Sequence, residues 1–299
     1  MKITLLGPLG ANFSDLARKD FGRIFDDHFL QTNDRSSFLL VDRNEDVLPS
    51  VIKDGGLGVV AMNTEAEGVY EAPFRKVVAL LDHYDNSGRC PVALIAALEK
   101  RVRFTLMVKK GTEFQEIQEV CAHPKSLGAC RNNIRAHGWR PIECNSNGKA
   151  AEYVARDPRY TKTAVLGPRE AVETFKELRV VPGYEALEDN PATTIFHLWG
   201  PRSRKRIAGL RENNMIVLAC RLFHKPNAKG SVMNSFGKRG INMLYDTQVF
   251  VGAAKYDHIF LYECRKDQVI AQREALQEVS KNSLVERCLM LGPVPIVKA

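Results

Sequence analysis

The chain has 299 residues, of which 44% are hydrophobic and 26% are charged, values that are ordinary for a globular protein. This balance excludes intrinsic disorder and a fibrous repeat, and no apolar run approaches the roughly 18 residues that a membrane span needs. The seven cysteines are an odd number and no two of them form a C-x-x-C pair, so we expect reduced thiols and no metal site. The sequence therefore predicts a folded cytoplasmic protein without a membrane segment.

The formal net charge of +8 raises the question of a nucleic-acid partner. The basic residues are spread along the chain among Asp and Glu residues, which argues against such a partner. The densest basic cluster is Arg202-Ser203-Arg204-Lys205-Arg206. Its first interpretation is a solvated linker, and the alternative is a binding patch for nucleic acid or another polyanion. A modest basic excess also suits a small anionic substrate.

The first two-thirds of the chain alternates short apolar runs with helical stretches, which is typical of an α/β protein with a mainly parallel sheet. Strands are predicted over residues 3–6, 38–41, 57–62, 92–98, 104–108, 119–122, 163–166 and 194–199. Helices are predicted over residues 12–21, 45–53, 67–84, 126–137 and 149–156. In the long helix over 67–84, apolar residues recur at spacings of three and four.

A polar and basic stretch over residues 200–213 has no apolar period and is predicted to be a linker. The chain is thereby divided into a first domain over residues 1–199 and a second over residues 214–299. In the second domain we predict a strand over 215–222, a helix over 230–239, an extended segment over 241–251, a strand over 259–264, a helix over 268–280 and a strand near 288–291. This βαββαβ order indicates a ferredoxin-like module.

Three segments place polar side chains after predicted strands and before predicted helices, where open α/β sheets bind ligands. Backbone N–H groups at the start of such helices can hold a carboxylate. The candidate substrate-binding residues in these segments are Asn12, Ser14, Asn63, Thr64, Ser146, Asn147 and Lys149. Each segment taken alone is also explained by an ordinary helix N-cap at Ser14, Asn63 or Asn147.

Several longer motifs occur along almost the whole chain in a consistent order. They are Gly7-Pro8-x-Gly10, Gly58-Val59-Val60, Ala122-His123-Pro124-Lys125-Ser126-Leu127-Gly128-Ala129-Cys130-Arg131, Asp189-Asn190-Pro191-Ala192-Thr193-Thr194-Ile195-Phe196, Lys238-Arg239-Gly240-Ile241-Asn242 and Met290-Leu291-Gly292-Pro293-Val294-Pro295. Together they resemble the prephenate dehydratase family. No single motif carries this resemblance.

The resemblance implies a bilobed domain of the type II periplasmic-binding-protein kind, followed by an ACT regulatory domain that pairs chains into a homodimer or homotetramer. Family members convert prephenate into phenylpyruvate with loss of CO2 and water, without a cofactor. The resemblance implies a catalytic role for Thr194, substrate contacts from Thr193 and Phe196 in the cleft between the lobes, and effector contacts from Gly230 and Asn242.

The chain departs from the family pattern at several of these motifs. The family's Thr-Arg-Phe is Thr194-Ile195-Phe196, its Glu-Asn-Ser is Asn63-Thr64-Glu65, and its usual lobe-crossing His is matched by Phe104. An apolar side chain at position 195 cannot make a bidentate contact to a carboxylate. The effector segments are altered to Gly230-Ser231-Val232-Met233 and Tyr245-Asp246-Thr247-Gln248, so weak phenylalanine binding is expected.

Three hypotheses about function follow. The altered motifs favour a prephenate lyase that removes CO2 without forming an aromatic ring, similar to antibiotic-pathway relatives of the family. An ordinary, divergent prephenate dehydratase of phenylalanine biosynthesis is the first alternative, and a non-catalytic small-molecule sensor is the second. His123 is interpreted either as a structural hydrogen-bonding residue or as an acid or base near neutral pH.

Overall fold

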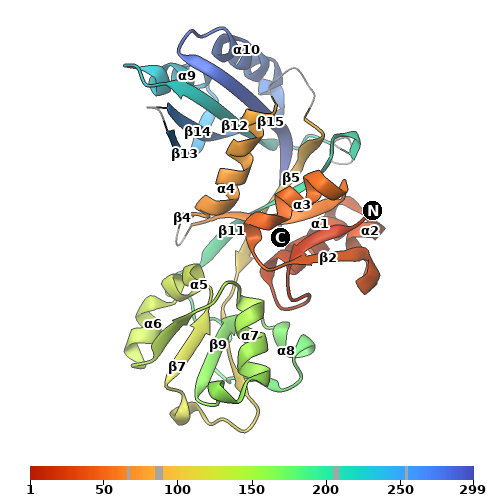
Figure 1. The fold of residues 1–299 in the computed structure, drawn as a ribbon, viewed down its shortest axis with the longest axis vertical. Coiled ribbons are helices and arrows are strands. Elements are labelled where there is room, and N and C mark those ends of the chain that lie inside the picture. Colours follow the sequence, from red (N-terminus) through yellow and green to blue (C-terminus); the bar gives the residue numbers. More distant parts are fainter. Residues whose placement is uncertain (66–67, 85–89, 205–208, 253–254) are drawn as a thin grey trace.

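The structure is a computed structural model, which describes residues 1–65, 68–84, 90–204, 209–252 and 255–299. The chain forms three bodies that follow one another along the long axis of the molecule (Figure 1). The amino-terminal lobe lies in the middle, the second lobe at one end and the C-terminal module at the other. None of the helices in the described ranges combines the length and the hydropathy of a membrane-spanning segment.

The amino-terminal lobe is built on a mixed sheet. Its strands are β1 (Ile3–Leu6), β2 (Phe38–Val41), β3 (Leu57–Thr64), β4 (Gly68–Val69), β5 (Val92–Val102) and β11 (Ala192–Pro201). Strand β1 pairs in parallel with β2 and β3, whereas β11 runs antiparallel between β3 and β5. Its helices are α1 (Phe13–Phe25), α2 (His28–Gln31), α3 (Val47–Asp54) and α4 (Glu71–Val78). Helix α1 buries Ala17 and Phe21 against the sheet because these residues lie four positions apart on one helix face.

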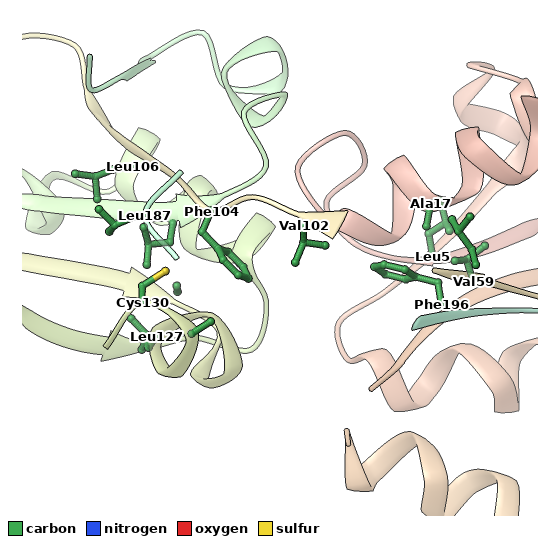
Figure 2. Close-up of a cluster of buried hydrophobic side chains, with 14 of the residues drawn as sticks. Leu5, Ala17, Val59, Val102, Phe104, Leu106, Leu127, Cys130, Leu187 and Phe196 are labelled. Carbon is green, nitrogen blue, oxygen red and sulfur yellow. The ribbon is translucent and has the colours of Figure 1, made fainter. Parts of the chain in front are cut away.

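The second lobe has its own five-stranded sheet. In spatial order its strands are β10 (Leu178–Val180), β6 (Thr105–Lys109), β9 (Thr163–Gly167), β7 (Glu119–Ala122) and β8 (Arg140–Glu143). Its helices are α5 (Pro124–Ala129), α6 (Arg131–Ala136), α7 (Asn147–Arg156) and α8 (Ala171–Thr174). Figure 2 shows how one buried cluster extends over both lobes, with Val102 at the end of β5 between Phe196 in one lobe and Phe104 in the other.

The C-terminal module has the predicted βαββαβ order. It consists of β12 (Asn213–Phe223), α9 (Ala228–Gly237), β13 (Asn242–Gly252), β14 (Lys255–Arg265), α10 (Val269–Ser280) and β15 (Val285–Lys298). Both helices pack on one face of its antiparallel sheet around Val232, Phe236 and Ala275. The bilobed α/β domain followed by a ferredoxin-like module is thus confirmed.

Strand β15 extends beyond the module and joins the sheet of the amino-terminal lobe. Its residues Ile296, Val297 and Lys298 pair in parallel with Ala97, Leu98 and Glu99 of β5, so that one ten-stranded sheet runs through both bodies. An ion pair of 2.9 Å between Arg221 and Asp82, and a hydrogen bond of 2.9 Å from Arg287 to the Leu81 carbonyl, add to this contact. The division at residues 199 and 214 stays a prediction.

Two predicted helices differ from the observed ones. Of the helix predicted over 67–84, α4 begins only at Glu71, because Gly68, with a φ of 70°, and Val69 turn back to pair with β3. The helix predicted over 126–137 is divided at Cys130, where the carboxylate of Asp189 accepts the backbone N–H groups of Asn132 and Asn133 and begins α6 anew. The start of α6 is therefore set by a distant residue.

Removal of residues 296–299 should destabilise the protein strongly. Ile296 and Val297 are both more than 90% buried, and burial of two such side chains contributes about 3 kcal/mol or more. We expect denaturant unfolding to show this loss in the free energy of unfolding. The exposed Lys298, which pairs with Glu99 at 3.0 Å, is the control, because Lys298→Ala should cost less than about 1 kcal/mol. An unchanged unfolding midpoint after the truncation would contradict the structural role of the pairing between β15 and β5.

Candidate active site

A cavity lies between the two lobes. We call it the inner cavity. Both lobes and the crossing segments contribute to its wall. The lining residues are Leu6, Asn12, Phe13, Ser14, Asn44, Ala61, Tyr70, Val102, Phe104, His123, Ser126, Asn145, Ser146, Asn147, Thr194 and Phe196.

Two wider cavities continue from the inner cavity toward the surface, and together the three form one interlobe cleft. The inner cavity shares Asn44, Tyr70, His123 and Asn145 with the first of them, and Asn145 and Ser146 with the second. The outer walls carry three cations and five acids, namely Arg43, Lys125, Lys149, Asp42, Glu45, Glu71, Glu143 and Glu152. By contrast, the described residues that line the inner cavity include no Asp, Glu, Lys or Arg.

Six of the ten residues predicted from sequence to act in the site line the inner cavity. They are Asn12, Ser14, Ser146, Asn147, Thr194 and Phe196. They come together because their segments follow β1, precede α7 or lie in β11, which meet where the lobes face each other. The apolar part of the wall includes Phe13 and Phe104, whose rings meet edge to face at 5.3 Å.

Asn12 and Ser146 hold the two lobes together. The Asn12 side chain accepts a hydrogen bond of 2.9 Å from the backbone N–H of Gly148, and Ser146 Oγ donates one of 3.2 Å to the Gly7 carbonyl. A Cβ at Gly148 would lie 2.4 Å from the Asn12 amide nitrogen, so this approach of the lobes requires glycine there. Both predicted ligands therefore position the walls of the cavity.

Ser14 has an unused hydroxyl at the cavity. Its side chain is buried, its Oγ makes no hydrogen bond with any described residue, and it lies in the first turn of the 13-residue helix α1. The N-terminus of a helix has unpaired N–H groups and a partial positive charge. An anionic group of a substrate at this end of the cavity would supply the missing partner.

His123 reaches the cavity from the second lobe as a neutral imidazole. Its Nδ1 accepts the backbone N–H of Lys125 at 3.2 Å, which places the ring proton on Nε2. Burial, with a smaller contribution from the charge of Lys125, lowers the pKa of His123 to about 4. Asn147 fixes its backbone by accepting the His123 N–H at 3.0 Å. His123 is thus suited to donate a hydrogen bond to a ligand at neutral pH.

Four predicted site residues lie away from the inner cavity. Lys149 lines an outer part of the cleft and pairs with Glu152 at 2.8 Å. Thr193 and Thr64 lie at the neighbouring ends of β11 and β3, where the Thr193 N–H donates to the Glu65 carboxylate at 3.1 Å. Asn63 lies on β3, and none of Asn63, Thr64 and Thr193 is among the residues that line the three parts of the cleft.

Ile195, which stands where the family has Arg, points away from the inner cavity. Thr194 and Phe196 line that cavity, whereas Ile195 packs on the core beneath α3 and α4. Its cross-strand neighbour is Asn63, which stands where the family has Glu, and the buried Oδ1 of Asn63 has no hydrogen-bond partner among the described residues. Because the two exchanged positions are neighbours, the change from Arg to Ile removes one half of a potential ion pair and the change from Glu to Asn removes the other.

Restoring both charges should show this coupling. Ile195→Arg alone places an unpaired cation against an apolar core and should lower the free energy of unfolding by about 2 kcal/mol. Adding Asn63→Glu should recover at least half of that loss, since neighbouring residues couple by about 0.5–3 kcal/mol. A double-mutant cycle in denaturant measures the coupling, and strictly additive effects would refute the pairing.

Sequence reasoning missed several wall residues. Asn44 lies in the connection between β2 and α3, where its side chain donates to the Ala61 carbonyl and accepts the Ala61 N–H. Tyr70 lies in a stretch predicted to be helical, and its ring centre is 5.7 Å from that of His123. Asn145 directly precedes Ser146, and Ser126 lies within the motif that runs from Ala122 to Arg131, but neither was singled out. The position of Asn145 beside Ser146 was the available signal, whereas Asn44 and Tyr70 are brought in by tertiary contacts alone.

Comparisons with known proteins agree with this geometry. Residues 3–200 match the family model for prephenate dehydratase. A prephenate dehydratase of Methanocaldococcus jannaschii is 25% identical over 192 residues, which are 64% of this chain and 65% of that protein. The crystal structure of a prephenate dehydratase from Arthrobacter aurescens in complex with L-Phe has a TM-score of 0.75 and 18% identity, over 98% of this chain and 89% of that one.

A structure described as GqqA, a novel type of quorum quenching acylase, has a TM-score of 0.69 and 19% identity over 98% of each chain. At such identities the structures show a shared fold, and one fold serves many chemistries. The match with the curated relative covers slightly less than two-thirds of its length. The family model, however, covers most of the chain and includes both lobes, so the chain belongs to the prephenate dehydratase family.

Proposed function

We propose that this protein is a lyase that converts prephenate into phenylpyruvate with loss of CO2 and water. The observation that carries the proposal is the inner cavity, whose wall combines the Thr194 hydroxyl group and the neutral His123 with the aromatic side chains of Phe13, Phe104 and Phe196. Membership of the prephenate dehydratase family supports the substrate class. Phe13, Phe104 and Phe196 would contact the cyclohexadiene ring, and the polar residues would contact the groups that leave.

The reaction breaks two bonds of the ring, one to the carboxylate and one to the hydroxyl group, and the same electrons connect the two events. Electrons from the breaking bond to the carboxylate move into the ring, the ring becomes aromatic, and the hydroxyl group opposite departs and takes up a proton, so that it leaves as water. The protein therefore has to orient the substrate and assist the departing oxygen. We assign this assistance to the Thr194 hydroxyl, with Nε2–H of His123 as a second donor on the cavity wall.

The substrate carboxylates need partners in a cavity without charged walls. The Ser14 hydroxyl and the N–H groups of the first turn of α1 are the proposed partners of one carboxylate. The second carboxylate would face the cleft mouth, where Arg43 and Lys125 line the adjoining wall from opposite lobes. Asn44 fixes the segment that carries Arg43 through its two hydrogen bonds to Ala61.

A decarboxylase that leaves the ring non-aromatic is the second candidate. It is favoured by the absence of Asp, Glu, Lys and Arg among the described residues of the inner cavity, since a charged group is the strongest partner for a leaving hydroxyl or a carboxylate. The argument from Ile195, however, loses its force because this side chain does not face the cavity. Membership of the prephenate dehydratase family, which the exchange at Ile195 does not contradict, therefore favours the dehydratase.

We further propose that the C-terminal module pairs two chains and binds phenylalanine weakly. Strand β13 lies at the edge of the ten-stranded sheet, and an edge strand presents unpaired backbone groups. Gly230 lies in the first turn of α9 and Asn242 begins β13, so the proposed effector contacts come from two adjoining elements.

Solution mass and calorimetry test these two statements. We expect a mass of two or four chains and no saturation of the binding isotherm at micromolar phenylalanine. A monomeric mass would contradict the pairing, and saturable micromolar binding would contradict the weak effector site.

Incubation of the purified chain with prephenate tests whether the cleft is catalytic. We expect prephenate to disappear in proportion to protein concentration, and the Thr194→Ala variant to bind the substrate with little turnover. If the unmodified chain binds prephenate without consuming it, the lyase function is wrong and the small-molecule sensor is favoured. If the chain neither binds nor consumes prephenate, prephenate is not its ligand.

A further inference from the structure

Cys144 differs from the other cysteines in its position. It lies between β8 and α7 and lines both outer parts of the interlobe cleft, and its backbone N–H donates to the Ala122 carbonyl at 2.9 Å. Among the seven cysteines, all of which lie in described parts of the chain, it is the one that is partly exposed. Its side chain also packs against the core of the second lobe, which contains Cys121 on the neighbouring strand β7.

The surroundings of Cys144 stabilise a thiolate. A hydrogen bond from the Cys121 thiol, backbone N–H groups of Ser146 and Asn145, and the charge of Lys149 lower the pKa of Cys144 to about 6, against the opposing effect of burial. The same contact and burial raise the pKa of Cys121, so the charge of the pair resides on Cys144. The site also lies just before the N-terminus of the ten-residue helix α7, which favours an anion.

We propose that Cys144 is a site of oxidation by hydroperoxides, with Cys121 as its resolving thiol, and that the oxidised cleft turns over substrate more slowly. The Cys144 thiolate attacks one peroxide oxygen, the O–O bond breaks, and the departing hydroxide or alkoxide takes up a proton. The sulfur is oxidised by two electrons to a sulfenic acid and the peroxide is reduced to water or an alcohol. Cys121 then attacks this sulfur, an S–S bond forms, and the S–O oxygen leaves as water with the Cys121 proton.

The consequence for the cleft follows from the sequence that continues after Cys144. Asn145, Ser146 and Asn147 line the inner cavity, and Asn147 accepts the backbone N–H of His123. A disulfide draws Cys144 toward the buried Cys121, because bonded sulfur atoms lie about 2.05 Å apart. This displacement of Cys144 also moves the three wall residues that follow it. One of them is Asn147, which accepts the backbone N–H of His123.

Peptide mass spectrometry of the full chain after treatment with hydrogen peroxide tests the chemistry without any activity measurement. We expect a Cys121–Cys144 disulfide in the unmodified protein and a trappable sulfenic acid at Cys144 in Cys121→Ser. In the untreated protein at pH 7, Cys144 should react with iodoacetamide at least about tenfold faster than the buried Cys130. Equal labelling of these two residues, or a disulfide that omits Cys144, would contradict Cys144 as the site of oxidation.

Prephenate turnover before and after peroxide tests the effect on the cleft. We expect treated protein to lose at least about 80% of its own untreated rate and to regain it with dithiothreitol. Cys144→Ser should retain its untreated rate after peroxide, whereas Cys130→Ala, the matched control in the same lobe, should remain as sensitive as the unmodified chain. Disulfide formation without loss of turnover would refute the effect on the cleft. If the protein shows no turnover at all, the proposed lyase function fails, while the labelling result still decides the thiol site.

Discussion

Thr194→Ala is expected to lower kcat for prephenate by about 100-fold or more, because a positioned proton or hydrogen-bond donor contributes about 10²- to 10⁴-fold to such a step. The side chain is buried at the cavity wall in β11, and its truncation removes the hydroxyl together with the γ-methyl group. KM should change less than threefold, since the expected contact develops as the ring hydroxyl departs. Steady-state kinetics of phenylpyruvate formation measures both constants.

Two matched variants make this result specific. Thr194→Ser keeps the hydroxyl group and should retain at least about a tenth of the unmodified kcat. Thr193→Ala alters the preceding residue, which lies outside the three parts of the cleft, and should leave kcat within about twofold. A Thr194→Ala variant with more than half of the original kcat would contradict the role of the Thr194 hydroxyl group in the reaction.

The stability of the protein should fall as the pH decreases below 6.5 because His197 is completely buried in the middle of β11. Burial lowers the pKa of His197 to about 3, and neither ring nitrogen has a hydrogen-bond partner among the described residues. The folded form therefore holds the neutral ring, whereas the unfolded chain takes up a proton near pH 6.5. The stabilising contribution is fully present above the unfolded pKa and is lost as the pH falls from 6.5 toward 3.

From this one group, the free energy of unfolding should decrease by about 2 kcal/mol between pH 7 and pH 5. His197→Leu removes the titration and two unsatisfied polar atoms, so its stability should depend less on pH by that amount. The exposed His28 supplies the control, since His28→Leu should keep the pH dependence of the unmodified chain. Equal slopes for all three proteins in urea unfolding would contradict the assignment of the acid sensitivity to His197.

Much of the fold follows from local patterns in the sequence. The strands over residues 3–6 and 38–41 match β1 and β2 because short apolar runs between polar segments identify strands, whether buried as in β1 or only partly buried at the sheet edge as in β2. The βαββαβ order of the C-terminal module follows from the same reasoning. The ladder between Ile296 and Ala97 could not be predicted in this way, because periodicity identifies strands and says nothing about pairing between distant segments.

The candidate site was predicted in part. Asn12, Ser14 and Thr194 were found because polar residues at strand ends or in a recognised motif lie where the lobes meet. The side chain of Ile195 was assigned to the cleft, although the two-residue period of a strand places it on the face opposite to Thr194 and Phe196. That signal was present in the sequence. The contacts that bring Asn44 to Ala61 depend on tertiary packing.

The ratio of CO2 released to phenylpyruvate formed tests the central claim most directly. For each prephenate consumed by the purified chain, CO2 is measured by trapping and phenylpyruvate by its absorbance. A dehydratase built on this cavity releases both in a ratio of one to one from the first turnovers. Release of CO2 without phenylpyruvate, together with a product that lacks the aromatic spectrum, would contradict the account and establish the non-aromatising decarboxylase.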